Sequence, residues 1–334
     1  MEAATRDHLF NHRVEIPIAI QHNCHPCQIR SFAIHSQYPI TIVNHLDDAV
    51  ISPEFKFIDT SIRGKGVHRS KKEFLSGCEC KDDEDCQYNT CSCLQEVEAD
   101  GSDVDLDEDD GCPVKKTYAY HAHGAKAGHL RSKFLESRKP IYECHDSCAC
   151  GPKCPNRVVE RGRKIPLQIF RTEGRGWGVR SASEIRKGQF IDKYIGEIIT
   201  ADEANRRRAE SHVAQRKDVY LFALDKFFDP DSFDDRLRGP SLEVDGEFMS
   251  GPTRFINHSC DPNLRIFARV GDHADRHLHD LAFFAIKDIA KGEELTFDYV
   301  DGFEDLENDT QDPAKLKDMT KCLCGSKNCR GYLW

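Results

Sequence analysis

Residues 254–263 read Arg-Phe-Ile-Asn-His-Ser-Cys-Asp-Pro-Asn, and residues 294–299 read Glu-Leu-Thr-Phe-Asp-Tyr. The second stretch is one of several β-branched or aromatic runs between residues 158 and 300 that end at Gly, Pro or Asp, a pattern typical of short strands. We expect such strands at residues 167–171, 189–195, 219–224, 264–270, 281–286 and 294–299. This part of the chain is therefore predicted to be a β-rich domain and not an alternating βαβ fold.

One helix interrupts these strands, and little else in the chain is predicted to be helical. Thr200 and Glu203 form a capping box for a helix from Ala201 to about Ser211. A short helix is expected around residues 128–136. The N-terminal segment, residues 1–77, carries no module that we can name. Its strand-like pieces at residues 40–43 and 55–58 suggest that it wraps the β-rich domain.

Composition limits the class of protein. The chain has 334 residues, a net charge of −10 and 16 cysteines. The negative charge argues against nucleic-acid binding as the main activity and favours a basic partner. The first ten residues do not resemble a signal peptide, and no apolar run approaches the ~20 residues of a membrane span. We therefore expect an intracellular protein, in which so many cysteines indicate metal ligands before disulfides.

Nine cysteines form two dense groups, C-x-C-x5-C-x4-C-x-C and C-x3-C-x-C-x3-C: Cys78, Cys80, Cys86, Cys91, Cys93, Cys144, Cys148, Cys150 and Cys154. Thiolates bind Zn²⁺ tetrahedrally, so three ions need twelve ligand positions, which nine sulfurs supply if three of them bridge. An all-sulfur site of this kind is structural. Buried thiols or disulfides are the alternative, but C-x-C steps fit disulfides poorly. The acidic stretch 96–110 between the groups is interpreted as a mobile loop.

A third group lies at the C-terminus and supplies three ligands: Cys322, Cys324 and Cys329. Cys260 is the candidate for the fourth ligand of one further zinc, which would tie the tail to the β-rich domain. The alternative is that Cys260 is an ordinary buried cysteine. Cys24, Cys27 and Cys112 have no such partners nearby in the sequence and are interpreted as free thiols.

These features together resemble a known family. The stretches 254–263 and 294–299, with Gly174-Arg-Gly-Trp-Gly178 and Tyr194-Ile-Gly-Glu197 upstream, resemble the motifs of SET-domain lysine methyltransferases. The nine-cysteine groups resemble the pre-SET module and the terminal group resembles the post-SET module. The resemblance extends from about Cys78 to Trp334, and it is strongest to the fungal enzymes of heterochromatin and DNA methylation that modify lysine 9 of histone H3.

The resemblance implies a fold and its boundaries. The fold is mainly β with short helices: a SET-domain β-fold with a pseudoknot, flanked by the three-zinc pre-SET cluster and the one-zinc post-SET tail. The expected divisions are an N-terminal segment (1–77), pre-SET (78–158), SET (159–300), a linker (301–317) and post-SET (318–334).

The resemblance also implies the cofactor and the residues that hold it. The methyl donor would be S-adenosylmethionine, with zinc as the structural metal. The residues expected to bind the donor are Arg175, Gly176, Trp177, Asp218, Tyr220, Arg254, Asn257, His258 and Leu323. Because glycines flank Trp177, the backbone there can approach a ligand closely. Leu323, between two zinc ligands, would close over the donor.

Catalysis and substrate binding follow from the same resemblance. Tyr194 and Tyr299 would border a lysine channel, and the expected catalytic set is Tyr194, Tyr299, Phe297, Asn257 and His258. Because the amine, with a pKa of ~10.4, must lose a proton before attack, the rate should rise between pH 7 and 9. A Phe at 297, where a Tyr hydroxyl would crowd the amine, predicts di- and trimethylation. The substrate would be the histone H3 N-terminal tail, added as a strand to a sheet edge and met by Asp225, Phe297 and Trp334.

The implied setting is chromatin in the nucleus, with partner proteins for recruitment and with no nucleic-acid specificity or membrane contact. Three other interpretations are weighed. Residues 173–178 mimic the glycine turn of a Rossmann-type methyltransferase, but residues 179–183 look like strand or turn where that fold needs a helix. An inactive zinc-stabilised adaptor is disfavoured because Tyr194, Asn257, His258 and Tyr299 are all present. An active enzyme with a non-histone substrate remains open.

Overall fold

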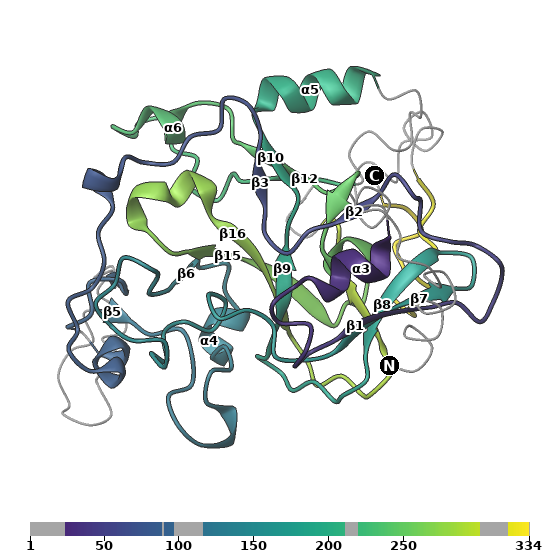
Figure 1. The fold of residues 1–334 in the computed structure, drawn as a ribbon, viewed down its shortest axis with the longest axis horizontal. Helices are drawn as coiled ribbons and strands as arrows, with labels where there is room; N and C mark the ends of the chain where they lie inside the picture. The colour runs from purple at the N-terminus through teal and green to yellow at the C-terminus, as the bar shows by residue number, and fades with distance from the viewer. Residues whose placement is uncertain (1–23, 89, 97–115, 211–219, 301–319, 334) are drawn as a thin grey trace.

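The computed structural model describes residues 24–88, 90–96, 116–210, 220–300 and 320–333. Within these ranges the protein is mainly β with short helices, which confirms the predicted fold class (Figure 1). The expected linker, Cys112, Asp218, Trp334 and nearly all of the acidic stretch lie outside the described residues.

A five-stranded sheet holds both motifs from which the fold was predicted. Its order is β1-β7-β8-β17-β14, with bounds Ile40–Val43, Leu167–Thr172, Gly176–Ser181, Glu294–Phe297 and Asn257–His258. Strands β14 and β17 are parallel, with Asn257 opposite Thr296 and His258 opposite Phe297. Two segments far apart in the sequence therefore lie side by side, as the expected pseudoknot requires. Strand β17 ends at Phe297 because the backbone N–H of Tyr299 turns to donate to Nδ1 of His258 at 3.2 Å.

Two four-stranded sheets complete the body of the fold. One has the order β6-β15-β16-β9, with bounds Ile141–Tyr142, Leu264–Val270, Asp280–Ala285 and Phe190–Tyr194. The other has the order β11-β12-β10-β3, with bounds Leu221–Ala223, Glu243–Asp245, Glu197–Ile199 and Ile62–Arg63. Two short pairs join β2 (Lys56–Phe57) to β13 (Met249–Ser250) and β4 (Gln95–Glu96) to β5 (Lys116–Thr117). The predicted strands are all present, although β2, β9 and β17 are two residues shorter than expected and β11, expected at 219–224, begins at Leu221 and ends at Ala223.

The helices are short and peripheral. They are α3 (His25–Arg30), α4 (Ser132–Leu135), α5 (Ala201–Glu210) and α6 (Asp235–Arg238). Helix α4 is shorter than the predicted 128–136 because Gly128 has a left-handed φ of +79° and Leu130 bridges Tyr120. Helix α5 lies where predicted, and the Thr200 hydroxyl accepts from the Glu203 N–H at 3.4 Å. The Glu203 carboxylate, however, binds Arg206 and Arg207, and not the cap backbone.

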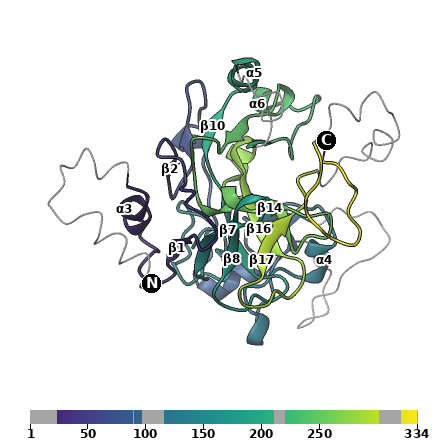
Figure 2. The same cartoon turned by 90° about the vertical axis from the view of Figure 1, so that its right-hand side faces the viewer.

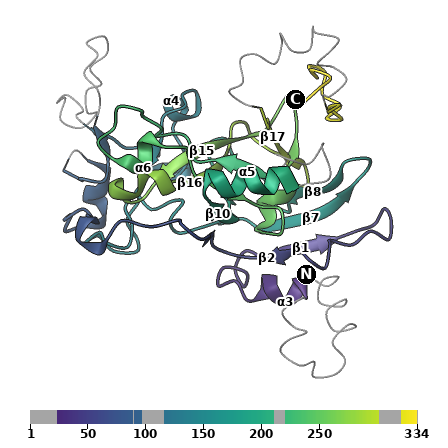
Figure 3. The same cartoon turned by 90° about the horizontal axis from the view of Figure 1, so that it is seen from above.

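The N-terminal segment joins three sheets of the domain. Strand β1 pairs in parallel with β7, β2 with β13, and β3 with β10. Helix α3 lies against β2, and Figure 3 shows this layer along one side of the molecule (Figure 3). Phe55 and Phe57 are 4 % exposed and their rings stand 5.0 Å apart. This segment therefore shares the hydrophobic core of the β-rich domain and wraps it, as the sequence suggested.

Candidate active site and metal centres

An aromatic cluster forms where three sheets meet. Its members are Tyr194 at the end of β9, Phe222 of β11, Phe297 at the end of β17, and Tyr299. Ring centroids are 4.5 Å apart for Tyr194 and Phe222, 5.9 Å for Phe222 and Phe297, and 4.7 Å for Phe297 and Tyr299. We call these four side chains the aromatic cluster. The sheet topology thus brings together both predicted catalytic tyrosines and the predicted specificity residue.

Both tyrosine hydroxyls in the cluster are held by backbone carbonyls. Tyr194 donates to the carbonyl of Tyr220 at 2.9 Å, and Tyr299 donates to the carbonyl of Ile256 at 2.7 Å. Because a carbonyl accepts each hydroxyl proton, the hydroxyl oxygens are left to act as acceptors and can accept a hydrogen bond from an amine. Burial raises the pKa of both tyrosines above the ordinary value of 10, so both stay neutral at physiological pH.

One glycine makes room for this arrangement. A Cβ at Gly246 would lie 2.4 Å from the Tyr194 hydroxyl oxygen, closer than real side chains approach. A larger residue at 246 would therefore displace the hydroxyl from the Tyr220 carbonyl. Tyr194 is 4 % exposed, so it has little space to move elsewhere.

A polar node links the glycine-rich turn to the two motifs. The Asn257 amide donates to the carbonyl of Trp177 at 3.2 Å and to Oε1 of Glu294 at 2.8 Å. The other carboxylate oxygen of Glu294 accepts from Arg175 at 2.5 Å. Gly176 has φ +75°, which favours glycine at this point of the turn. Residues 175–177 are thus fixed against β14 and β17.

Arg254 lies among aromatic faces beside the cluster. Its guanidinium carbon is 4.0 Å from the ring centroid of Tyr220 and 5.1 Å from that of Phe55. Its Nε also donates to the carbonyl of Gly246 at 3.3 Å. A cation held over rings in this way keeps Tyr220 in a fixed orientation.

The site fits S-adenosylmethionine by the chemistry of its donors. Backbone carbonyls, aromatic rings and phenol oxygens surround one region, and such groups stabilise a sulfonium cation and its polarised methyl group. The residues that would hold this donor are Arg175, Gly176, Trp177, Tyr220, Arg254, Asn257 and His258. The polar node links Asn257 to Trp177 and Glu294, and the cation–π contact links Arg254 to Tyr220.

His258 connects the aromatic cluster to a cysteine group. Its Nδ1 accepts from the Tyr299 backbone N–H, so its proton resides on Nε2, which lies 3.3 Å from Sγ of Cys260. The Sγ atoms of Cys260, Cys322, Cys324 and Cys329 all lie within 4.8 Å of one another. Figure 2 shows the tail beside β17 (Figure 2). This set supports Cys260 as the fourth ligand of the post-SET zinc.

A second contact fastens the same tail. Arg330, directly after Cys329, donates to both carboxylate oxygens of Asp298 at 2.6 and 2.7 Å. The backbone N–H of Arg330 also lies 3.4 Å from Sγ of Cys260. Asp298 stands between the two aromatic residues Phe297 and Tyr299. The tail is therefore joined to the segment that follows β17, between Phe297 and Tyr299, by an ion pair, and to Cys260 by its sulfur atoms.

The nine pre-SET sulfurs match a shared zinc cluster. All nine cysteines occur in overlapping groups of four whose Sγ atoms lie within 4.8 Å of one another. Sγ of Cys144 is 3.9 Å from Sγ of both Cys78 and Cys91, and Cys78 is 3.8 Å from Cys86. Zinc–sulfur bonds of about 2.3 Å in a tetrahedron give an edge of about 3.8 Å, whereas a disulfide needs about 2.05 Å. The spacing fits zinc, with Cys78 and Cys144 placed to bridge.

Donors around the sulfurs offset their negative charge. Nη2 of Arg157 lies 3.3 Å from Sγ of Cys150, and Nδ2 of Asn156 lies 3.5 Å from Sγ of Cys144. The backbone N–H of His145 donates to Sγ of Cys148 at 3.2 Å. Three Zn²⁺ and nine thiolates carry a net charge of −3, which such hydrogen bonds and one guanidinium stabilise.

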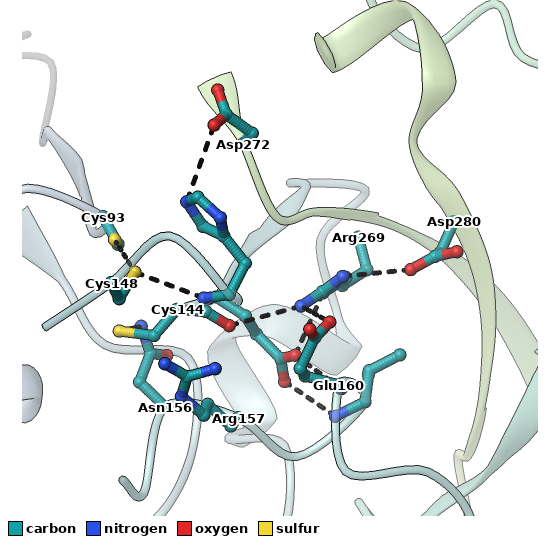
Figure 4. A network of polar contacts seen from close by, with 12 residues as sticks. Cys93, Cys144, Cys148, Asn156, Arg157, Glu160, Arg269, Asp272 and Asp280 are labelled. Carbon is teal, nitrogen blue, oxygen red and sulfur yellow. Dashed lines mark hydrogen bonds and ion pairs between the residues drawn. The ribbon is translucent and has the colours of Figure 1, made fainter. Parts of the chain in front are cut away.

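A buried ion network joins the pre-SET cluster to the SET sheet (Figure 4). Arg269 of β15 donates to Glu143 at 3.0 Å, to Glu160 at 2.6 Å and to Asp280 at 3.1 Å. It also reaches the carbonyl of Cys144 at 3.4 Å. Glu143 is fully buried and accepts from the Tyr120 hydroxyl and two backbone N–H groups. Each of these charges is thus paired and hydrogen-bonded, which a buried charge requires.

Four predicted residues are either exposed or outside the described chain. Leu323 is 64 % exposed on the tail, and Asp225 is exposed just beyond β11. Asp218 and Trp334 lie outside the described residues.

Sequence reasoning missed several partners. Glu294 opens the second motif, but nothing in the motif says that it binds both Arg175 and Asn257. Phe222 lay in a predicted strand without any sign of which face it would occupy. The Asp298–Arg330 pair had no signal at all, since the two residues are 32 positions apart.

Comparison with known proteins agrees with this geometry. Residues 176–300 match the SET domain family and residues 32–157 match the Pre-SET motif family. The chain is 62% identical over 335 residues to the H3 lysine-9 specific histone-lysine N-methyltransferase dim-5 of Neurospora crassa, covering all of both chains. It is 60% identical over 343 residues to the H3 lysine-9 specific KMT1 of Fusarium mangiferae, covering 100% of this chain and 99% of the relative.

A solved structure shows the same arrangement. The structure of the Neurospora SET domain protein DIM-5, a histone lysine methyltransferase, aligns with a TM-score of 0.72 at 59% identity. The alignment covers 86% of this chain and all of that one. The chain belongs to the SET-domain histone-lysine N-methyltransferases, an S-adenosylmethionine-dependent family, and the predicted enzyme class is confirmed. In the described residues, no helix has the length and apolar character needed to cross a membrane.

Proposed function

We propose that this enzyme di- and trimethylates lysine 9 of histone H3, with the aromatic cluster as the wall of the lysine channel. The observation that carries the proposal is the meeting of Tyr194, Phe222, Phe297 and Tyr299 beside the edge strand β11. The relatives named above, which are H3 lysine-9 specific, support the choice of substrate.

The substrate tail would pair with β11. Among the described strands, β11 is paired on one side only, with β12. Its central residue, Phe222, belongs to the aromatic cluster, so a peptide along this edge would pass the cluster. Asp225 is exposed two residues past the end of β11 and would meet a basic side chain of the tail. Pairing of this kind supplies backbone hydrogen bonds, while side-chain contacts select the sequence.

The chain's own residues would position the amine. When bound, S-adenosylmethionine supplies the methyl group as an electrophile. The lone pairs of Tyr194 and Tyr299, whose protons are engaged by carbonyls, would accept from the amine N–H groups and align its lone pair. Asn257, Arg175 and Glu294 would hold residues 175–177 against the donor.

Phe297 would set the number of methyl groups. Its ring is 4 % exposed and packs 4.7 Å from Tyr299 and 5.0 Å from Phe283, and it offers no hydroxyl. A Tyr at this position would add an acceptor that binds the amine and restricts its rotation between transfers. We therefore infer that Phe297 leaves room for the second and third methyl groups.

One experiment tests site, substrate and product together. The enzyme with its donor is incubated with two H3 tail peptides, one with the native lysine at the ninth position and one with arginine there. The products are weighed by mass spectrometry. We expect mainly dimethyl and trimethyl lysine at the ninth position, and no transfer to the arginine peptide.

Two variants sharpen the product assignment. Phe297→Tyr should shift the product to monomethyl, whereas Phe283→Tyr, a control in the same packing, should not. Trimethyl product from Phe297→Tyr would refute the role of Phe297. Methylation of the arginine peptide would refute the assigned target lysine.

The second candidate is an active enzyme with a non-histone substrate, because an exposed sheet edge is not selective by itself. Methylation of a peptide array by the same enzyme would separate the two. We also propose a nuclear, chromatin-bound location with recruitment by partner proteins, in keeping with a histone substrate.

A further inference from the structure

A basic strap crosses the surface of this acidic protein. Residues 63–72 contain five Arg and Lys side chains and no acid, although the whole chain has a net charge of −10. The cations are Arg63, Lys65, Arg69, Lys71 and Lys72. We call residues 63–72 the basic strap. A local concentration of charge opposite to the overall sign is not explained by the methyl-transfer site.

The strap is fixed to the fold at both ends. At its start, the N–H of Ile62 donates to the carbonyl of Gly196 at 3.0 Å, and the N–H of Gly64 donates to the carbonyl of Ile198 at 2.8 Å. Val67 is 5 % exposed. Toward its end, the N–H of Ser70 donates to Asp275 at 2.7 Å. These anchors hold the backbone that carries the charged side chains.

The charged side chains point to solvent. Arg63, Lys65, His68, Arg69, Lys71 and Lys72 are all exposed. Arg69 lies 3.6 Å from Asp275, but its side chain is still 66 % exposed. Among the described residues, Lys65, Lys71 and Lys72 form no ion pair. Three lysines with their charges in water and an ordered backbone can therefore bind an external anion.

The strap lies on the same sheet as the proposed substrate edge. The sheet order is β11-β12-β10-β3, so β3, which opens into the strap, is at one edge and β11 is at the other. With strands about 4.8 Å apart, the two edges are separated by about 15 Å. A histone tail on β11 comes from a particle whose surface is wrapped in DNA. A phosphate backbone close to the tail is then within reach of the strap.

We propose that the basic strap binds the phosphodiester backbone of nucleosomal DNA while the aromatic cluster holds the histone tail. The inference rests on the proposed function for its geometry. Lys and Arg contacts to phosphates position a protein on DNA without reading sequence. Because the chain as a whole is negative, DNA is repelled elsewhere, so the strap also orients the enzyme. This contact would raise activity on nucleosomes above that on free tail peptides.

The test compares two triple variants with equal charge changes. The strap triple is Lys65→Ala, Lys71→Ala and Lys72→Ala. The matched control is Lys153→Ala, Lys187→Ala and Lys291→Ala, three lysines that are exposed elsewhere on the surface. Affinity for a fluorescent duplex of about 20 base pairs is measured by anisotropy over a series of salt concentrations. The kcat/KM values for an H3 tail peptide and for mononucleosomes are measured in parallel.

We expect the strap triple to lower the slope of log affinity against log salt by about 2 to 3, since each phosphate contact contributes about 0.9. Its kcat/KM on nucleosomes should fall about tenfold, while kcat/KM on peptide stays within about twofold. The control triple should behave like the parent enzyme in all three measurements.

Three outcomes would overturn the proposal. Equal weakening of DNA binding by both triples would mean that only net charge matters. If the strap triple changed neither DNA affinity nor nucleosome activity, the strap would be excluded as a DNA-binding site. A loss of nucleosome activity without a loss of DNA affinity would mean that the strap binds an acidic protein surface of the nucleosome and not its DNA. If no peptide is methylated, the proposed function fails, but the duplex measurement still decides whether the strap binds DNA.

Discussion

The two metal centres differ in how deeply the fold surrounds them. Of the nine pre-SET cysteines, eight are buried and Cys148 is half-buried, and they share a hydrophobic cluster with Leu94, Tyr120 and Phe284. Of the four cysteines grouped at the post-SET site, Cys329 is exposed and the other three are half-buried. The first centre lies inside a core, and the second fastens a tail to its surface.

This difference indicates two roles for similar chemistry. The pre-SET centre is continuous with the SET sheet through Arg269 and Glu143, so its loss removes part of the core and leaves buried charges unpaired. The post-SET centre is held to the sheet by Cys260 and by the Asp298–Arg330 pair, both beside the aromatic cluster. We infer that the first metal centre maintains the fold, whereas the second closes the active site.

Zinc removal should give the largest effect. A slow titration with chelator should release about one zinc per chain first, with loss of activity but little change in circular dichroism. The next three should leave together with cooperative unfolding, because binding and folding free energies are linked. Zinc release is followed with a colorimetric indicator. Release of all four in a single step would contradict the division of roles.

Matched cysteine variants refine that result. Cys144→Ser alters a fully buried sulfur placed to bridge, and it should prevent recovery of folded, soluble protein. Cys322→Ser should leave a folded protein with about three zincs and low activity. Zinc analysis and circular dichroism of both variants check these outcomes. A folded and fully metallated Cys144→Ser enzyme would show that the pre-SET sulfurs are not shared as described.

The ion network should contribute the next largest effect. Arg269→Ala leaves Glu143 buried without its cation and should lower the free energy of unfolding by about 3–5 kcal/mol. Arg265→Ala, on the same strand and half-buried, is the control and should cost about 1 kcal/mol. Urea denaturation gives both values. Equal costs would mean that Arg269 stabilises only by packing, and not by joining the two regions.

Loss of the tail ion pair should affect activity but not metal content. Arg330→Ala should raise KM for donor and peptide so that kcat/KM falls about tenfold, because the tail is no longer held against Asp298. All the zinc should remain. Arg330→Lys should rescue poorly, since lysine cannot form the bidentate pair. Lys327→Ala, exposed on the same tail, should have no effect. Zinc loss from Arg330→Ala would instead make Arg330 part of the metal centre.

The smallest expected effect is that of pH on the reaction rate, and it involves one tyrosine on the pre-SET side and one on the post-SET side. Tyr194 lies in the sheet that contains β6 next to the pre-SET cysteines, whereas Tyr299 contacts His258 on the post-SET side. Burial raises the pKa of both phenols, so both remain protonated from pH 7 to 9. A rate increase over that range, roughly threefold to tenfold, should therefore report deprotonation of the substrate amine. Single-turnover rates of the Tyr194→Phe variant should rise with pH in parallel with those of the parent enzyme. A parent rate that stays constant from pH 7 to 9 would contradict the need for deprotonation of the amine.

Much of the fold could be predicted because its signals are local. Strands β15 (Leu264–Val270) and β1 (Ile40–Val43) lie where alternating and β-branched residues placed them. The capping residue Thr200 fixed the start of α5, since the cap is a contact three residues apart. The cysteine spacings indicated metal because the C-x-C steps fit disulfides poorly. The predicted helix at 128–136 was too long because Leu130 instead bridges Tyr120 and donates its N–H to the carbonyl of Gly188, which lies far from it in the sequence.

Residue types and spacing were sufficient for the thirteen candidate zinc ligands, since these depend on which atoms the chain offers, and the resemblance of the motifs to a known family implied the enzyme class and the role expected of Phe297. Packing between distant segments decided which residues meet in the site. It paired Glu294 with Asn257, placed Phe222 against Tyr194 and joined Asp298 to Arg330. It also placed the basic strap at the sheet edge opposite β11. Such contacts join residues tens or hundreds of positions apart, and their energies depend on the approach of surfaces that no local pattern encodes.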